Sequence, residues 1–185
     1  MAQSTAPFLD DQDFKDFLRE FQAESDRAAA ILAAAYLDDL LGRLLLASFV
    51  DDTQHCRHLV DGDRALSSFS ARIPACYAFG LLSESERFDL DQVRGIRNRF
   101  AHERHGLTFV DESISAKCGT FKCIEETLQA LPGAFGTQPP QAPKTLFVMD
   151  ASLLGFYLRS RVSHAKRTLR PMWPLWQPWK PEQGA

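Results

Sequence analysis

The chain has 185 residues, a formal net charge of −3 and 45% apolar residues. This length allows one ordinary domain with a sizeable core, and the composition is that of a globular protein. The charge excludes a general attraction to nucleic acid, so any anionic partner must be bound by a local basic patch. The four cysteines follow no disulfide or Cys-x-x-Cys spacing, which indicates reduced thiols, with Cys76 in the core.

Targeting and membrane signals are absent from the sequence pattern. Residues 1–13 contain neither a basic nor an apolar region, so they do not resemble a signal peptide. The longest apolar stretch, 146–158, contains Asp150 and is too short to span a bilayer. We therefore expect a cytoplasmic protein with no membrane contact.

Helical periodicity predicts an all-α bundle of about six or seven helices. In chain order, helices are expected over residues 11–22, 26–49, 51–59, 66–79, 83–102, 111–128 and 145–170. Ser25 is suited to cap the second of these, and Ser83 with Glu86 forms a capping box for the fifth. Pro74 is expected to kink the fourth helix, and Gly80 to end it.

Composition divides the chain into a core domain, a linker, a last helix and a tail. Their ranges are 1–130 for the helical core, 131–144 for the Pro/Gly-rich linker, 145–170 for a C-terminal helix on the core, and 171–185 for the Pro/Trp-rich tail. The tail holds Trp173, Trp176 and Trp179. Because exposed tryptophans are costly, we expect them to bury against the protein's own surface, a second subunit or a protein partner.

The segment 96–102, Ile-Arg-Asn-Arg-Phe-Ala-His, carries the most suggestive polar side chains. Arg97 is suited to bidentate phosphate contact and His102 to acid–base chemistry, while Asn98 could orient either group. Together they could cleave RNA without a metal, using the ribose 2′-hydroxyl as nucleophile. On an ideal helix Arg97 and His102 point about 140° apart. Both reach one phosphate only if the helix unwinds near Gly106 or a second subunit completes the site.

A structural role is the alternative: Arg97 pairs with a carboxylate, and His102 caps the helix. Asp38 lies on the rim of the apolar stripe of its own helix, where a carboxylate needs a partner. We expect Arg97 to be that partner, with Arg43 as the local rival. Asp38 would then orient Arg97 in either function, and a solvated charge is the remaining alternative.

Basic residues extend the site around Arg97. Arg94, Arg99, Arg104 and His105 form a local patch that could hold a nucleic-acid backbone, although a solvated helix face would look the same. No helix-turn-helix pattern accompanies them. The fragment His55-Cys56-x-His58 lacks a second ligand pair at zinc spacing, so we expect neither a metal site nor a cofactor.

Four segments, in order, resemble the mannitol operon repressor family of bacteria. They are Phe-Gln-Ala-Glu-Ser-Asp-Arg at 21–27, Tyr-Leu-Asp-Asp-Leu-Leu at 36–41, Phe-Ser-Ala-Arg-Ile at 69–73, and the segment 96–102. The resemblance covers roughly residues 14–120. It implies an all-helical regulator that lacks an obvious DNA-binding motif and acts through protein partners.

The Arg-Asn-x-x-x-His arrangement is also similar to the signature of HEPN domains. That resemblance implies a dimeric helical bundle and a metal-independent endoribonuclease of toxin–antitoxin or phage-defence type. Arg97 and His102 would then be catalytic, with Asn98 in support, and a homodimer would bring two sites together. Two functions follow, a regulator with protein partners and an RNase. The broader resemblance favours the first, which predicts Arg97 buried against Asp38, whereas the RNase predicts an open basic cleft.

Overall fold

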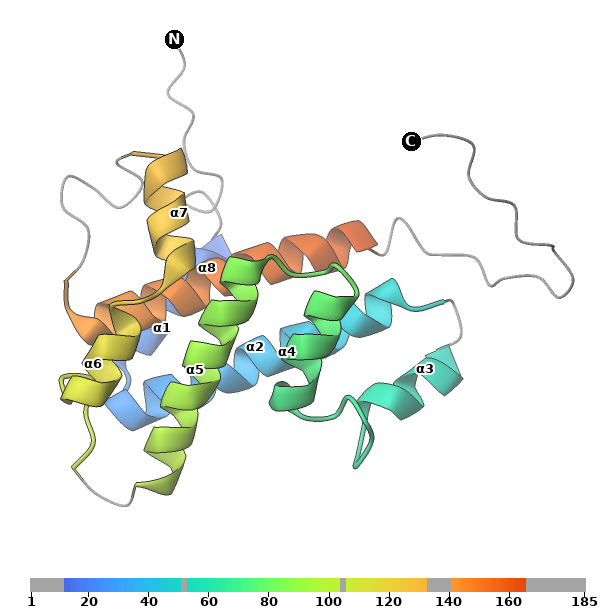
Figure 1. Cartoon of the computed structure of the whole chain (residues 1–185), viewed down its shortest axis with the longest axis horizontal. Coiled ribbons are helices and arrows are strands. Elements are labelled where there is room, and N and C mark those ends of the chain that lie inside the picture. Colours follow the sequence, from blue (N-terminus) through green and yellow to red (C-terminus); the bar gives the residue numbers. More distant parts are fainter. Residues whose placement is uncertain (1–11, 51–52, 104–105, 133–140, 166–185) are drawn as a thin grey trace, which may run out of the picture.

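The computed structural model describes residues 12–50, 53–103, 106–132 and 141–165, which form a helical bundle (Figure 1). Its helices are α1 (Gln12–Ala23), α2 (Asp26–Ser48), α3 (Thr53–Val60), α4 (Phe69–Ala78), α5 (Glu84–His102), α6 (Glu112–Cys118), α7 (Lys122–Ala130) and α8 (Pro143–Ala165). No strand occurs among the described residues, so the predicted all-α class is confirmed, with eight helices rather than six or seven.

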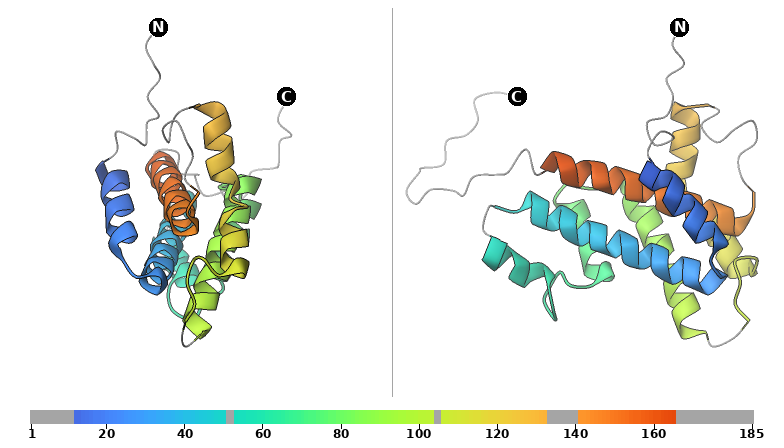
Figure 2. Two further views of the ribbon diagram at one scale, coloured as in Figure 1. Left: turned by 90° about the vertical axis from the view of Figure 1, so that its left-hand side faces the viewer. Right: turned by 180° about the vertical axis from the view of Figure 1, so that it is seen from behind.

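Helices α2 and α8 run side by side through the centre of the molecule (Figure 1). Helix α1 covers them on one side, and α4 to α7 lie on the other (Figure 2). The central pair can approach closely because Gly155 has no side chain: a Cβ there would lie 2.7 Å from Cε1 of Tyr36. None of the described helices combines the length and apolar composition needed to cross a membrane.

A row of three neighbouring aromatic rings, each tilted against the next, anchors α5 to the core. The ring of Phe100 lies 5.1 Å from that of Phe109, which in turn lies 5.0 Å from that of Phe147 on α8. Ile96 is also completely buried, one turn before Phe100. Because these residues fix the inner face of α5, the polar residues between them are directed toward the surface.

The start of α5 has the predicted capping box. The Glu86 backbone N–H donates to Ser83 Oγ, and the Ser83 N–H donates to Glu86 Oε2 at 2.8 Å. The Glu86 carboxylate also pairs with Arg161 of α8, at 2.6 Å from Nη1 to Oε1. This local motif therefore also ties α5 to the central helix pair. Gly80 follows α4 with φ of 69°, as the sequence predicts for a helix end.

The predicted single helix over 111–128 is wrong, because the chain breaks into α6 and α7 at Gly119. The reason is a cap supplied by another helix. The carboxylate of Asp89 on α5 accepts the N–H groups of Lys122 and Cys123, at 3.0 and 2.7 Å. Two smaller differences are that α4 begins later, after its cap Ser68, and that α8 begins at Pro143, inside the predicted linker.

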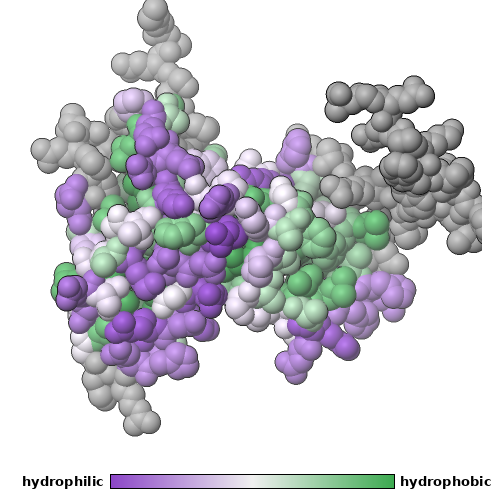
Figure 3. Space-filling model, in the orientation of Figure 1, coloured by the Kyte–Doolittle hydropathy of each residue, from purple (hydrophilic) through white to green (hydrophobic). Residues whose placement is uncertain are grey.

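Most large apolar side chains lie inside, but some remain at the surface. On the face drawn in Figure 3, hydrophobic residues gather over α3 and α4 on the right of the view. Leu59 is 46% exposed and Phe79 is 57% exposed. Val110, which follows α5, is 77% exposed. An apolar area at α3 and α4 is thus left without cover from the described residues.

Candidate functional site

A hollow of about 370 Å³ lies where α5 passes α2 and the start of α4. Its polar lining comes from three helices or their caps: Asp38, Ser68, Ser70, Arg94, Arg97 and Asn98. Ile31 and Phe69 contribute apolar wall. Four residues that the sequence singled out therefore lie around one hollow, and we call it the Arg97 hollow.

Arg97 is exposed at the rim of this hollow. Its Nη1 donates to Oδ1 of the neighbouring Asn98 at 3.0 Å. The other arginines of α5 are held in ion pairs of 2.8 to 3.3 Å, Arg87 and Arg94 with Asp91, and Arg99 with Glu103. Within the described residues, Arg97 is the arginine of α5 that has no carboxylate at ion-pair distance. Its guanidinium is therefore available for an external anion.

The expected pairing of Asp38 with Arg97 is wrong. Asp38 Oδ1 lies 2.7 Å from Nη1 of Arg72, which comes from α4. Burial raises the pKa of Asp38, while the charge of Arg72, and that of Arg97 from farther away, opposes the rise. The local rival Arg43 pairs instead with Asp39 at 2.7 Å. Asp38 thus lines the Arg97 hollow without forming an ion pair with Arg97.

Arg72, which contacts Asp38 of the lining, connects three segments beside the hollow. Its guanidinium donates to the backbone oxygens of Asp38, Leu66 and Val60 at 2.9 to 3.1 Å, besides the Asp38 carboxylate. A Cβ at Gly42 would lie 3.1 Å from Arg72 Cζ, so glycine makes room for the guanidinium against α2. Arg72 therefore holds the start of α4 against α2, and with it the wall of the hollow.

His102 does not lie in the Arg97 hollow. Helix α5 continues without unwinding to His102, and Glu103 occupies the C-cap position. The imidazole is exposed, and no hydrogen bond joins it to the described residues. One chain therefore does not bring Arg97 and His102 to a common site. Arg99 points to Glu103 and Ser113 instead, while Arg104 and His105 lie outside the described residues.

Sequence reasoning missed the serines that complete the hollow. Ser68 caps α4 by accepting the N–H of Ala71, and its Oγ lies 3.0 Å from Oγ of Ser70. These hydroxyls stand at the N-terminus of α4, where the helix dipole favours negative charge. The signal that could have found them is Ser68 as an N-cap, directly before the segment 69–73. With Arg97 opposite, the hollow is suited to a carboxylate or phosphate group.

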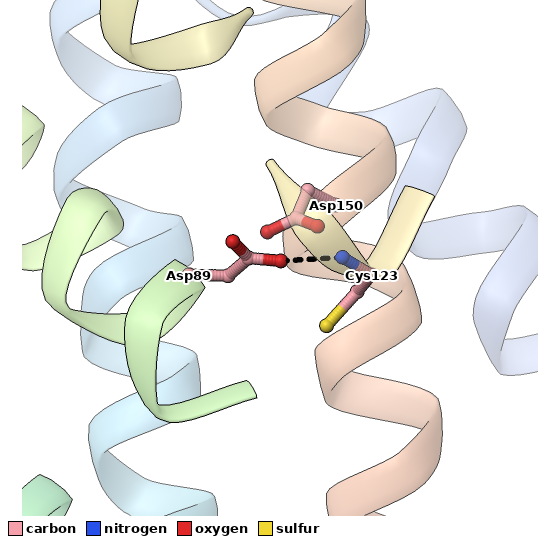
Figure 4. A group of neighbouring side chains, drawn as sticks. All are labelled: Asp89, Cys123 and Asp150. Carbon is pink, nitrogen blue, oxygen red and sulfur yellow. Dashed lines mark hydrogen bonds between the residues drawn. The ribbon is translucent and has the colours of Figure 1, made fainter. Parts of the chain in front are cut away.

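A second cluster, buried between α5, α7 and α8, contains Asp89, Cys123 and Asp150 (Figure 4). One ligand atom of each lies within 4.8 Å of the others, so the group could bind a divalent cation. Burial and the neighbouring Asp89 raise the pKa of Asp150 well above its usual range. Burial also raises the pKa of the Cys123 thiol.

A single proton on Asp150 removes the repulsion between the two carboxyl groups of this cluster. Burial raises the pKa of Asp89, and the two backbone N–H groups of α7 that its carboxylate accepts oppose this rise by favouring the ionised form. Neither carboxyl oxygen of the fully buried Asp150 has a hydrogen-bond partner among the described residues, and its pKa is raised, so we infer that it is neutral and that its proton is directed at the neighbouring Asp89. We interpret the pair as a carboxylic acid bonded to the carboxylate that caps α7. From the sequence, only Asp150 stands out, because it interrupts the apolar stretch 146–158; its two neighbours are far from it in the chain.

The fold of this chain is similar to that of a known protein structure. No protein-family model and no curated protein matches the chain. Among solved structures, a chain of the X-ray structure of the MtlR–HPr complex from Escherichia coli is similar, with a TM-score of 0.61 and 22% sequence identity. The match covers 80% of this chain and 99% of that one. At this identity the likeness shows an MtlR-like fold.

Proposed function

We propose that the protein is a regulator that acts by binding other proteins, as MtlR does in its complex with HPr. The observation that carries the proposal is the match over 99% of the MtlR chain. The resemblance of residues 14–120 to the mannitol operon repressor family points in the same direction. A regulator of this kind needs an accessible recognition surface rather than an assembled catalytic centre.

The Arg97 hollow is the recognition site that this proposal favours. Its exposed guanidinium has no carboxylate partner among the described residues, and the serines at the start of α4 add hydrogen-bonding groups. An acidic or phosphorylated side chain of a partner could enter the hollow and bind Arg97 bidentately. A hydrogen bond to a charged group contributes about 1.5–3 kcal/mol, so this contact would matter to affinity.

The endoribonuclease alternative has a specific observation in its favour, the accessibility of both Arg97 and His102. The burial of Arg97 against Asp38, which we expected of a regulator, is not found, because Arg97 is exposed and Asp38 pairs with Arg72. It also has a geometric difficulty, because the unbroken helix α5 leaves His102 outside the hollow. A second subunit would have to bring its own His102 to the Arg97 of the first. The regulator needs no such addition, so we place it first.

Calorimetric titration of the full chain with purified HPr tests the proposed regulatory function. We expect binding, and we expect Arg97→Ala to weaken it by about 10-fold or more, the equivalent of the hydrogen bonds lost. Arg43→Ala is the matched control, since it removes an exposed arginine that is paired with Asp39 on α2. Unchanged affinity in Arg97→Ala would exclude the hollow as the contact, and absence of binding would exclude HPr as the partner.

Incubation with varied RNAs in EDTA separates the two functions. The regulator predicts no cleavage. The RNase function would be established by a different result. The wild type would cleave RNA and leave 2′,3′-cyclic phosphate ends, and both Arg97→Ala and His102→Ala would abolish the cleavage.

A further inference from the structure

A larger hollow, of about 650 Å³, lies between α3 and the C-terminal ends of α2, α4 and α8. Its lining is mainly apolar: Leu44, Phe49, Val50, Leu59, Phe79 and Leu81. We call it the apolar groove. Phe79 of its lining is 57% exposed. Figure 3 shows hydrophobic residues gathered over α3 and α4, two of the elements that border the groove. Apolar surface of this kind on a folded protein usually has an occupant.

The described chain ends at the groove. Ala165, the last residue of α8, is itself part of the lining, as is His164. Twenty residues, 166–185, follow it in the sequence. The eight residues that follow Ala165, up to and including Trp173, can span up to about 26 Å when extended, which is ample to reach any part of the groove. A segment tethered so closely has an effective concentration on the order of millimolar.

The sequence of the tail matches an aromatic-lined groove. Its tryptophans, at 173, 176 and 179, recur at every third residue and alternate with prolines at 171, 174 and 178. A polyproline II segment has three residues per turn, so this spacing would put the three indoles on one face. Such segments dock in grooves lined by aromatic rings. Here Phe49 and Phe79 line the groove, with ring centroids 6.4 Å apart in an edge-to-face arrangement.

We propose that residues 171–179 bind in the apolar groove of the same chain, with the tryptophan side chains against Phe79, Phe49 and Leu59. The segment covers the exposed apolar surface and buries indoles that would otherwise lie in water. The tail and the groove are thus both apolar and aromatic, and the tail begins where α8 ends, at the groove itself. This inference does not depend on the regulatory function proposed above.

Intrinsic tryptophan fluorescence tests the inference directly, because all three tryptophans lie in the tail. For the native full-length protein we expect blue-shifted emission and several-fold weaker acrylamide quenching than for the same protein in urea. Phe79→Asp should move both readouts toward the unfolded values. Val110→Asp is the matched control, because it puts the same charge at an exposed apolar residue outside the groove, and it should change neither.

Three results would overturn the inference. The first is native emission and quenching equal to those in urea. The second is equal protection in the wild type and in Phe79→Asp, with the helical circular dichroism of both preserved. The third is protection that is lost on dilution, which would assign the groove to the tail of a second copy. If Phe79→Asp does not fold, Leu59→Asp serves in its place, since Leu59 is 46% exposed and lies on α3.

Discussion

Replacing Asp150 by asparagine should stabilise the protein, and increasingly so as the pH rises. Asp150 is fully buried and its pKa is raised well above the usual value of 3.8 by burial and by Asp89. Below about pH 3 both the folded and the unfolded carboxyl are protonated, so the group contributes no pH dependence. Above that pH the unfolded carboxyl ionises while the native one keeps its proton. The free energy of unfolding then falls by about 1.4 kcal/mol per pH unit until the native pKa is reached.

Asparagine does not titrate, and its amide can donate to Asp89 as the neutral carboxyl does. The advantage of Asp150→Asn should therefore grow by up to about 2.7 kcal/mol between pH 5 and pH 7. Urea unfolding followed by circular dichroism measures the difference at each pH, with the exposed Asp61→Asn as control. A difference that does not change with pH would refute the reasoning. A destabilised Asp150→Asn, with wild-type stability that falls in EDTA, would show instead that the cluster binds a metal.

Other changes test the packing and the assembly. Gly155→Ala should lower the free energy of unfolding by about 1–3 kcal/mol, because its Cβ would meet Tyr36; an unchanged urea midpoint would mean that α2 and α8 are not so close. Arg72→Ala should cost about 3 kcal/mol in the same assay, since it leaves the Asp38 carboxylate and three backbone oxygens without their donor. Ser83→Ala should cost about 1 kcal/mol, and a loss below a tenth of that would contradict the capping role. Light scattering after gel filtration should give the mass of a homodimer; a monomer at micromolar concentration would contradict the predicted assembly.

The features that sequence reasoning found are those with local causes. The helix over 26–49 is marked by an N-cap serine and an alanine-rich run, and α5 by a capping box and its apolar stripe. Each signal involves residues a few positions apart, so the chain alone determines it. The same holds for Gly80, whose positive φ marks the end of α4.

The features that were missed are set by contacts between distant segments. Asp38 needed a cationic partner, as expected, but the one that reaches it is Arg72, 34 residues along the chain. The break between α6 and α7 depends on Asp89, 33 residues before Lys122. In both cases a carboxylate was recognisable, whereas the identity of its partner depended on helix packing. The prediction of Arg97 and Asn98 as site residues stands untested, although the structure places them in one hollow.

The contacts of Arg72 also affect how fast a partner could associate at the Arg97 hollow. Four hydrogen bonds, to α2, to the last residue of α3 and to the loop between α3 and α4, hold the start of α4 in position. The serine wall of the hollow is thus preorganised, and mainly the Arg97 side chain has to lose rotamer freedom on binding. We therefore expect rigid-body association whose rate depends on ionic strength through one cation, rather than a slow step of helix rearrangement.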